Sequence, residues 1–195
     1  MSKKISTLAA ILMAAIFAAA FLTSCRTVPP EPLLEEEPPE EILAEVYEPE
    51  PPKELPNFEP NEFELRVFEL VNNERRFRRL QPLIWDDAAF IAARLHSMDM
   101  HDNDFLRHRG SNGTNTGQRL ECVGIKNLSS WAAGLGGGWL TPEDVVDAWM
   151  ESPIYRENIL RPEFTHTAVG FVERSEDSNA RFATYWNQIF FTFTL

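Results

Sequence analysis

The chain has 195 residues and a formal net charge of −12, and its charges divide it into three parts. Residues 1–25 carry only Lys3 and Lys4, residues 26–62 carry twelve Glu against two basic residues, and residues 63–195 have a net charge of −4. The last part is long enough for one domain with a core. An acidic chain without a basic stripe is not expected to bind nucleic acid, and two Cys cannot support a disulfide-rich scaffold.

The first segment is typical of an exported, lipid-anchored protein. A basic start precedes the uncharged, Ala-rich run 5–22, and small polar residues then lead to Cys25. This segment resembles a bacterial lipoprotein signal peptide, which implies removal of residues 1–24 and attachment of the mature chain to a membrane through lipidated Cys25. Arg26 follows this Cys, which resembles outer-membrane sorting if the cell is Gram-negative. An uncleaved membrane helix and an ordinary secretory signal are the alternatives.

Residues 25–62 are expected to form a disordered tether. They are rich in Pro and Glu, and a self-repelling, Pro-rich segment cannot form a core. If Cys25 is acylated, the sequence holds no other Cys that could form a disulfide with Cys122, so no internal disulfide is expected. We interpret Cys122 as a small buried hydrophobe rather than a nucleophile, because no base lies near it in the sequence.

The folded domain, residues 63–195, is predicted to open with two helices. Asn61 and Glu64 match a capping box, and Asp86 or Asp87 is expected to cap the second helix after a short extended stretch. Helical spacing predicts two buried stripes. The residues of the first stripe are Phe63, Val67, Leu70 and Val71. Those of the second are Ala88, Ile91, Ala92, Leu95 and either Met98 or Asp99.

Two polar or Gly-rich stretches are predicted to be irregular. Residues 101–118 are read as a loop. Residues 124–140 contain five Gly and are read as irregular, and the segment Gly134–Gly138 within them is read as a flexible rim that could act as a mobile lid. Trp131 and Trp139 flank this rim, where they either bind a ligand or anchor the loop.

The last third is predicted to hold two helices and a β-hairpin. Thr141 followed by Pro142 is a strong helix start, and Ser152-Pro153 begins another helical turn. The apolar runs 168–174 and 183–193 predict a hairpin. Both faces of the last run are apolar, so it is expected to be a central strand with helices on both sides. The order of elements favours a layered α/β/α domain of the α/β class.

Several motifs support a more specific interpretation. They are LVNNER at residues 70–75, PLIWD at 82–86, AWMESP at 148–153, RENILRP at 156–162 and YWNQIF at 185–190. In this order they resemble the bacterial branch of the CAP family, the group of cysteine-rich secretory proteins, antigen 5 and pathogenesis-related 1 proteins, also called SCP-like. The resemblance implies an α-β-α sandwich, no obligatory disulfide and an extracytoplasmic location.

The cleft of this family usually holds two His and two Glu, which bind a divalent metal such as zinc in some members. By resemblance, His108 stands at the first His position, Leu135 replaces a Glu, and Tyr155 replaces the second His. Glu151 lies near the position of the other Glu. A stable zinc site needs three or four N, S or O donors, so neither a metal nor another cofactor is expected.

The predicted ligand cleft combines these positions with polar residues of the central motifs. Its residues are His108, Leu135, Tyr155, Arg156, Asn158 and Gln188. His96 is expected to be structural, at a boundary between a helix and the sheet.

The chain keeps the family's sequence motifs but has lost most of the His and Glu residues that bind metal in the family. Together with the lipoprotein-like segment, this predicts a membrane-anchored, non-catalytic binding module. Its ligand would be an envelope component, a small apolar molecule or a protein. The alternative is a hydrolase of peptides or cell-wall material with His108 as the general base, assisted by Glu151 or Tyr155. A third hypothesis is a purely structural envelope spacer.

Overall fold

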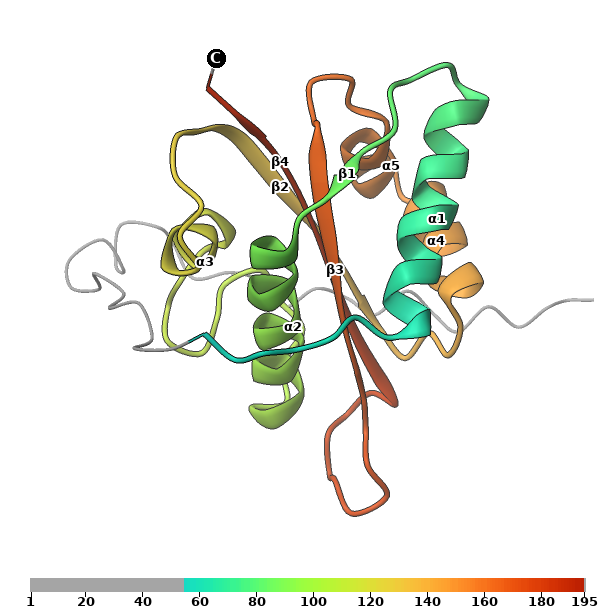
Figure 1. Cartoon of the computed structure of the whole chain (residues 1–195). Helices are drawn as coiled ribbons and strands as arrows, with labels where there is room; N and C mark the ends of the chain where they lie inside the picture. Colours follow the sequence, from blue (N-terminus) through green and yellow to red (C-terminus); the bar gives the residue numbers. More distant parts are fainter. Residues whose placement is uncertain (1–54, 195) are drawn as a thin grey trace, which may run out of the picture. The chain divides into compact units, whose positions relative to one another are not determined.

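The computed structural model describes residues 55–194, which form a four-stranded sheet between two layers of helices (Figure 1). The elements in chain order are α1 (Glu62–Phe77), β1 (Ile84–Trp85), α2 (Asp87–Asp102), α3 (Thr116–Cys122), β2 (Leu128–Gly137), α4 (Pro142–Glu151), α5 (Pro153–Leu160), β3 (His166–Glu173) and β4 (Thr184–Phe193). Helices α2 and α3 cover one face of the sheet, and α1, α4 and α5 cover the other (Figure 1). The predicted α-β-α sandwich is confirmed.

The strand order is β1-β3-β4-β2, with β1 parallel to β3 and the other pairs antiparallel. The predicted hairpin is confirmed as β3 and β4, and β4 is central as expected. Its side chains alternate between the layers as predicted, since Trp186 and Phe190 pack toward α1 and α4, whereas Ile189 and Phe191 pack toward α2. The predicted signal peptide, Cys25 and most of the predicted tether lie outside the described residues.

Within residues 55–194, the structure contains no helix of the length and apolar character that a membrane crossing requires.

Helix α1 begins as the sequence predicts and carries two buried charged groups that the sequence did not predict. The Asn61 side chain accepts hydrogen bonds from the amides of Phe63 and Glu64, and the Glu64 carboxylate accepts one from the Asn61 amide at 2.8 Å. Glu64 is fully buried and also binds Arg94 of α2 and the Phe171 amide of β3. A carboxylate from α1 therefore joins both helical layers to the sheet.

The second buried charge of α1 is the guanidinium of Arg75, which is also fully buried. It donates to four backbone carbonyls at 2.8–3.1 Å, those of Gln81, Ile159, Arg161 and Phe164. Three of these acceptors lie at the end of α5 and in the connection to β3. Arg75 therefore fixes the course of the chain at that turn.

The predicted buried stripe of α2 is wrong by about one position. Its buried residues are Ala89, Phe90, Ala92, Ala93, His96, Ser97 and Met100. The prediction followed the larger apolar side chains, Ile91 and Leu95, which are only half-buried. The helix instead presents small residues to β3, because Gly170 lies directly against the backbone of Ala93. Close approach of two backbones, rather than side-chain hydrophobicity, selects this face.

The prediction that residues 124–140 are irregular, with a flexible rim at Gly134–Gly138, is also wrong, because most of this stretch is β2, a ten-residue strand paired with β4. The glycines of this strand make room for packing. A Cβ on Gly136 would lie 2.8 Å from Cγ2 of Val145 in α4. Trp139, at the end of the predicted rim, is buried, and its carbonyl accepts from the indole of Trp186 at 2.8 Å. The segment is therefore not a mobile lid.

The loop predicted for residues 101–118 ends earlier than expected, because α3 begins at Thr116. Asn115 and Gln118 form a capping box at its start. This Asn-x-x-Gln signal was present in the sequence and was missed.

The outer edge of β2 faces side chains instead of another strand. The Gly138 amide donates to the Thr184 carbonyl at 2.9 Å, so the even-numbered residues of β2 turn their backbone groups toward β4 and the odd-numbered ones turn theirs away. Two of the outward carbonyls have side-chain donors. The indole of Trp149 binds the carbonyl of Leu135 at 2.7 Å, and the amide of Asn158 lies 3.5 Å from that of Ala133.

The start of α4 allows a controlled test of capping. The Thr141 hydroxyl accepts from the Asp144 amide at 3.1 Å, whereas Ser152, at the start of α5, makes no such bond. Thr141→Ala is therefore expected to lower the free energy of unfolding by about 1 kcal/mol. Ser152→Ala should change it by less than about 0.5 kcal/mol. Urea denaturation followed by circular dichroism would measure both, and equal effects would contradict the capping role.

Candidate functional site

A pocket of about 390 Å³ lies at the outer edge of β2, between α5 and the segment that leads into α3. We call it the His108 cleft. Its lining residues are His108, Arg109, Asn115, Thr116, Trp131, Ala133, Ile154 and Asn158. It contains two residues of the predicted ligand cleft, His108 and Asn158, which are 50 positions apart in the sequence. The exposed fraction of the Trp131 side chain is 42% and that of Ile154 is 71%, so the cleft is open to solvent and has apolar walls.

Helix α5 positions residues in three directions. Tyr155 and Ile159 are buried in the core. Ile154 and Asn158, four positions apart and therefore on one helical face, line the His108 cleft. The remaining face of α5 borders a second, larger pocket. One short helix thus separates two pockets and anchors itself by a third face.

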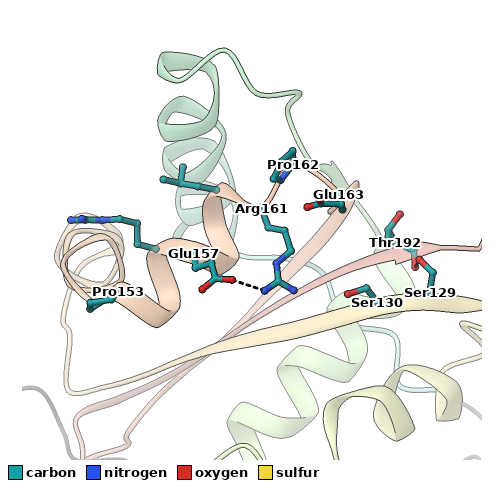
Figure 2. A pocket seen from close by; sticks show the side chains of 10 residues that line it. Ser129, Ser130, Pro153, Glu157, Arg161, Pro162, Glu163 and Thr192 are labelled. Atoms are coloured by element: carbon teal, nitrogen blue, oxygen red, sulfur yellow. Dashed lines mark hydrogen bonds and ion pairs between the residues drawn. The ribbon is translucent and has the colours of Figure 1, made fainter.

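The second pocket, which we call the α5 pocket, has a volume of about 810 Å³ (Figure 2). Its lining residues are Ser129, Ser130, Pro153, Arg156, Glu157, Leu160, Arg161, Pro162, Glu163 and Thr192. The guanidinium of Arg161 pairs with the Glu157 carboxylate at 2.9 Å, and both lie across from the strand residues Ser130 and Thr192 (Figure 2). Arg156 lines this pocket and not the His108 cleft, and its Nε donates to the carbonyl of Met150.

The structure does not bring the other predicted cleft residues to His108. Leu135 is 3% exposed and packs with Met100 and Leu106 on the α2 side of the sheet. Tyr155 is buried on the opposite side, in the cluster formed with α1 and α4. Leu135 and Tyr155 thus lie on opposite sides of the sheet, and neither lines the His108 cleft.

Gln188 and Glu151 also lie away from the His108 cleft. Gln188 is fully buried in the central strand, where its amide donates to the Thr167 hydroxyl at 3.1 Å. Glu151 is exposed at the end of α4 and lines neither pocket. Neither Glu151 nor Tyr155, the two residues predicted to assist His108, is among the residues that line the cleft.

The residues of the cleft do not fit a metal ion. None of its lining residues is acidic, and His108 is its only imidazole. In the part of the chain that the structure describes, no group of three or more His, Cys, Asp or Glu side chains could hold a metal. The donor set of residues 55–194 therefore falls short of the three or four ligands that zinc requires.

His96 lies on the buried face of α2 and is 1% exposed. Its Nε2 lies 3.0 Å from the carbonyl of Arg107, and its Nδ1 has no hydrogen-bond partner among residues 55–194. Burial, assisted by the positive charge of Arg119, lowers the pKa of His96 well below its usual value. His96 is therefore a neutral, structural residue, as its place on the helix predicts.

This burial predicts an acid-sensitive contribution to stability. The pKa of His96 is lower in the folded chain than the unfolded value of about 6.5, so its neutral form stabilises the fold above that pH, and the stabilisation is lost as the pH falls. Acidification from pH 7.5 to 5.5 should remove about 1 kcal/mol through this group. His96→Gln is expected to be less stable at pH 7.5 but to lose less on acidification. Equal pH slopes in urea denaturation would refute this.

Sequence reasoning missed several residues of the cleft. Arg109, Thr116 and Ile154 were not predicted as site residues. The capping box at Asn115 could have located the start of α3, and the four-residue spacing of Ile154 and Asn158 could have placed both on one face. Arg109 carried no local signal, since its relation to α5 exists only in the folded domain.

Comparison with known proteins identifies the class to which this fold and cleft belong. The family described as "CAP: Cysteine-rich secretory protein family" matches residues 68–192. The chain belongs to this family, which confirms the resemblance found in the motifs.

Individual relatives support the same assignment. The chain is similar to the uncharacterized protein YkwD of Bacillus subtilis, with 38% identity over 111 residues, which span 57% of this chain and 43% of YkwD. It therefore spans less than half the length of that relative.

Solved structures also share the fold. An extracellular SCP-domain protein of Bacillus anthracis matches with a TM-score of 0.57 and 24% identity, over 66% of this chain and 39% of that one. An outer surface protein of Borrelia burgdorferi matches with a TM-score of 0.58 and 17% identity, over 66% of this chain and 90% of that one. At these identities the likeness concerns the fold.

Proposed function

We propose that this chain is an extracytoplasmic, lipid-anchored CAP-domain protein that binds a small ligand in the His108 cleft without transforming it. The observation that carries the proposal is an open cleft that keeps His108 but has no acidic lining residue. The location is supported by the basic start, the apolar run 5–22 and Cys25. The descriptions "extracellular" and "outer surface" of the two structural relatives agree with it.

The composition of the cleft favours binding over hydrolysis. Acid–base hydrolysis commonly uses a pair of titratable side chains at the reacting bond, one as base and one as acid. Glu151 and Tyr155 do not line the cleft, and no lining residue is a carboxylic acid. A volume of about 390 Å³ suits a small molecule, and Trp131 and Ile154 offer exposed apolar surface to it. An envelope component or a small, partly apolar molecule is the ligand we propose.

Ligand capture tests this proposal. The mature full-length chain would be purified from cell envelopes, and small molecules released from it would be identified by mass spectrometry. Trp131→Ala is expected to lose the captured compound. Phe77→Ala removes an aromatic ring that is 85% exposed and lies outside both pockets, so it should retain the compound. Equal capture by the two variants would reject the cleft as the binding site. Turnover of peptides or cell-wall fragments that His108→Ala abolishes would instead establish the hydrolase.

The proposed anchor has its own test. Cells supplied with an alkyne-tagged palmitate should incorporate the label into the native chain and into Cys122→Ser, but not into Cys25→Ser. The two variants match in chemistry and differ only in which Cys is lost. Label retained by Cys25→Ser would contradict lipidation at this position.

A further inference from the structure

We infer that the His108 cleft selects a small organic anion, with its charged group held by Arg109 and its apolar part resting on Trp131 and Ile154. The inference depends on the proposed function in one respect, because it assumes that this cleft is a ligand site. It adds the chemical class of the ligand and the residue that recognises it.

The first argument is the state of Arg109. Its Nη1 donates to the carbonyl of Gly113 at 2.9 Å, while its Nε is buried without a hydrogen-bond partner among residues 55–194. It forms no salt bridge with an acidic residue of this part of the chain. The positive charge of Arg109 therefore has no carboxylate partner among residues 55–194, and an anion in the cleft would supply one.

Other arginines of this acidic domain do find carboxylates. The guanidinium of Arg66 lies 2.8 Å from a Glu143 oxygen, and that of Arg161 lies 2.9 Å from a Glu157 oxygen. Arg94 pairs with the buried Glu64. In the α5 pocket the positive charge is thus compensated by the chain itself, whereas in the His108 cleft it is not. A negatively charged ligand can therefore pair with Arg109 in the His108 cleft. In the α5 pocket it would have to compete with the Glu157 carboxylate for Arg161.

The second argument is the surplus of hydrogen-bond donors around Arg109. Asn115 uses its side-chain oxygen to cap α3, which leaves its amide hydrogens as donors. The Thr116 hydroxyl accepts from Arg119 at 3.1 Å, so its own hydrogen remains to donate. With no lining carboxylate, donors outnumber acceptors in the cleft, and an anion is the complementary group.

The third argument concerns the apolar wall. A Cβ on Gly117 would lie 2.6 Å from the Nε1 of Trp131, so the indole rests directly on the backbone of α3 and is held in place. Ile154 projects from α5, and Ala133 lies between them on β2. An anion with an aromatic or short aliphatic body can therefore bind with its charged group at Arg109 and its body on this wall.

A matched pair of probes tests the inference on the full mature chain. 3-Phenylpropionate carries a carboxylate, and 3-phenylpropanamide has the same shape without the charge. Calorimetric titration at millimolar probe concentration is expected to show the carboxylate binding at least about tenfold more tightly, the factor typical of a charge-assisted hydrogen bond. Arg109→Gln should remove this preference. Arg174→Gln should keep it, because Arg174 also binds a backbone carbonyl, that of Ala180 at 2.9 Å, but lies outside the cleft.

Ile154 provides variants that do not disturb the fold, because its side chain is 71% exposed. Both Ile154→Glu and Ile154→Lys remove part of the apolar wall and should weaken binding of the amide to a similar extent. Relative to the amide, Ile154→Glu should weaken binding of the carboxylate several-fold, and Ile154→Lys should strengthen it. Equal affinity for the two probes, binding of neither probe, or an unchanged preference in Arg109→Gln would overturn the inference. Those results leave the capture experiment with Trp131→Ala standing, so the failure of the anion and the failure of the binding site are distinguishable.

Discussion

Gly170→Ala is expected to lower the free energy of unfolding by about 3 kcal/mol or more. The added Cβ would lie 2.3 Å from the backbone carbon of Ala93 and 2.4 Å from its carbonyl oxygen. Neither atom can rotate away, so α2 would have to move off β3, and the core cluster that includes Ala89, Ala93 and Ala168 would lose contacts. Urea denaturation followed by circular dichroism would measure the loss.

Two variants control this experiment. Gly134→Ala also adds a methyl group to a strand glycine, but there the nearest atoms lie at 3.6–3.8 Å, so it should change stability by less than about 1 kcal/mol. Ala93→Gly should fail to rescue Gly170→Ala, since the clash involves the backbone of residue 93 and not its side chain. Rescue by Ala93→Gly, or equal effects of the two glycine substitutions, would contradict the close contact between α2 and β3.

The second large effect is expected at Arg75. Arg75→Met removes the shared donor of four buried or partly buried carbonyls and should lower the free energy of unfolding by about 4 kcal/mol. The amides of Leu160, Arg161, Glu163 and Phe164 should also exchange hydrogen faster, because three of the lost bonds hold the chain between α5 and β3. Denaturation and hydrogen exchange followed by mass spectrometry would measure the two effects.

Substitutions at and beside Arg75 separate charge from geometry. Arg75→Lys keeps the charge but cannot reach four acceptors, so it should recover only part of the stability. Arg76→Met alters the next residue, which is exposed and whose side chain bonds only to Asn73 in the described part of the chain, and should cost less than about 0.5 kcal/mol. A similar loss in Arg75→Met and Arg76→Met would refute the role of the buried guanidinium.

The elements that the sequence predicted well are those with local causes. Asn61, Asp86 and Thr141 each cap the helix they were expected to cap, because a cap depends on backbone groups two or three residues away. The sequence also predicted that β4 is buried on both faces, since large apolar residues occupy alternate positions on each side of the strand. Such signals act over a few positions and survive in any fold that contains the element.

The misinterpreted elements have distant causes. The Gly-rich strand β2 looked irregular, because the neighbours that require its glycines, such as Val145 beside Gly136, belong to another helix. The buried face of α2 depends on Gly170, some eighty residues away. No local pattern indicated that Glu64 and Arg75 are buried, since their partners lie up to 107 positions from them in the chain.

The candidate site divides in the same manner. The family resemblance located His108, and the central motif located Asn158. The apparent replacements Leu135 and Tyr155 were assigned to the same cleft, but they occupy opposite faces of the sheet. Arg109 and Ile154 join the cleft only through the packing of α5 against β2, which no local pattern encodes.

Side chains cover the outer edge of β2, and this affects whether neighbouring copies of the domain can pair through that edge. An open strand edge is a template on which another chain can add a strand, which leads to aggregation. In this domain Trp149 and Asn158 already occupy the carbonyls of Leu135 and Ala133, and α5 stands in front of the edge. Edge-to-edge pairing of neighbouring copies is therefore blocked at the centre of β2. Asn158 thus lines the cleft and also covers part of this strand edge.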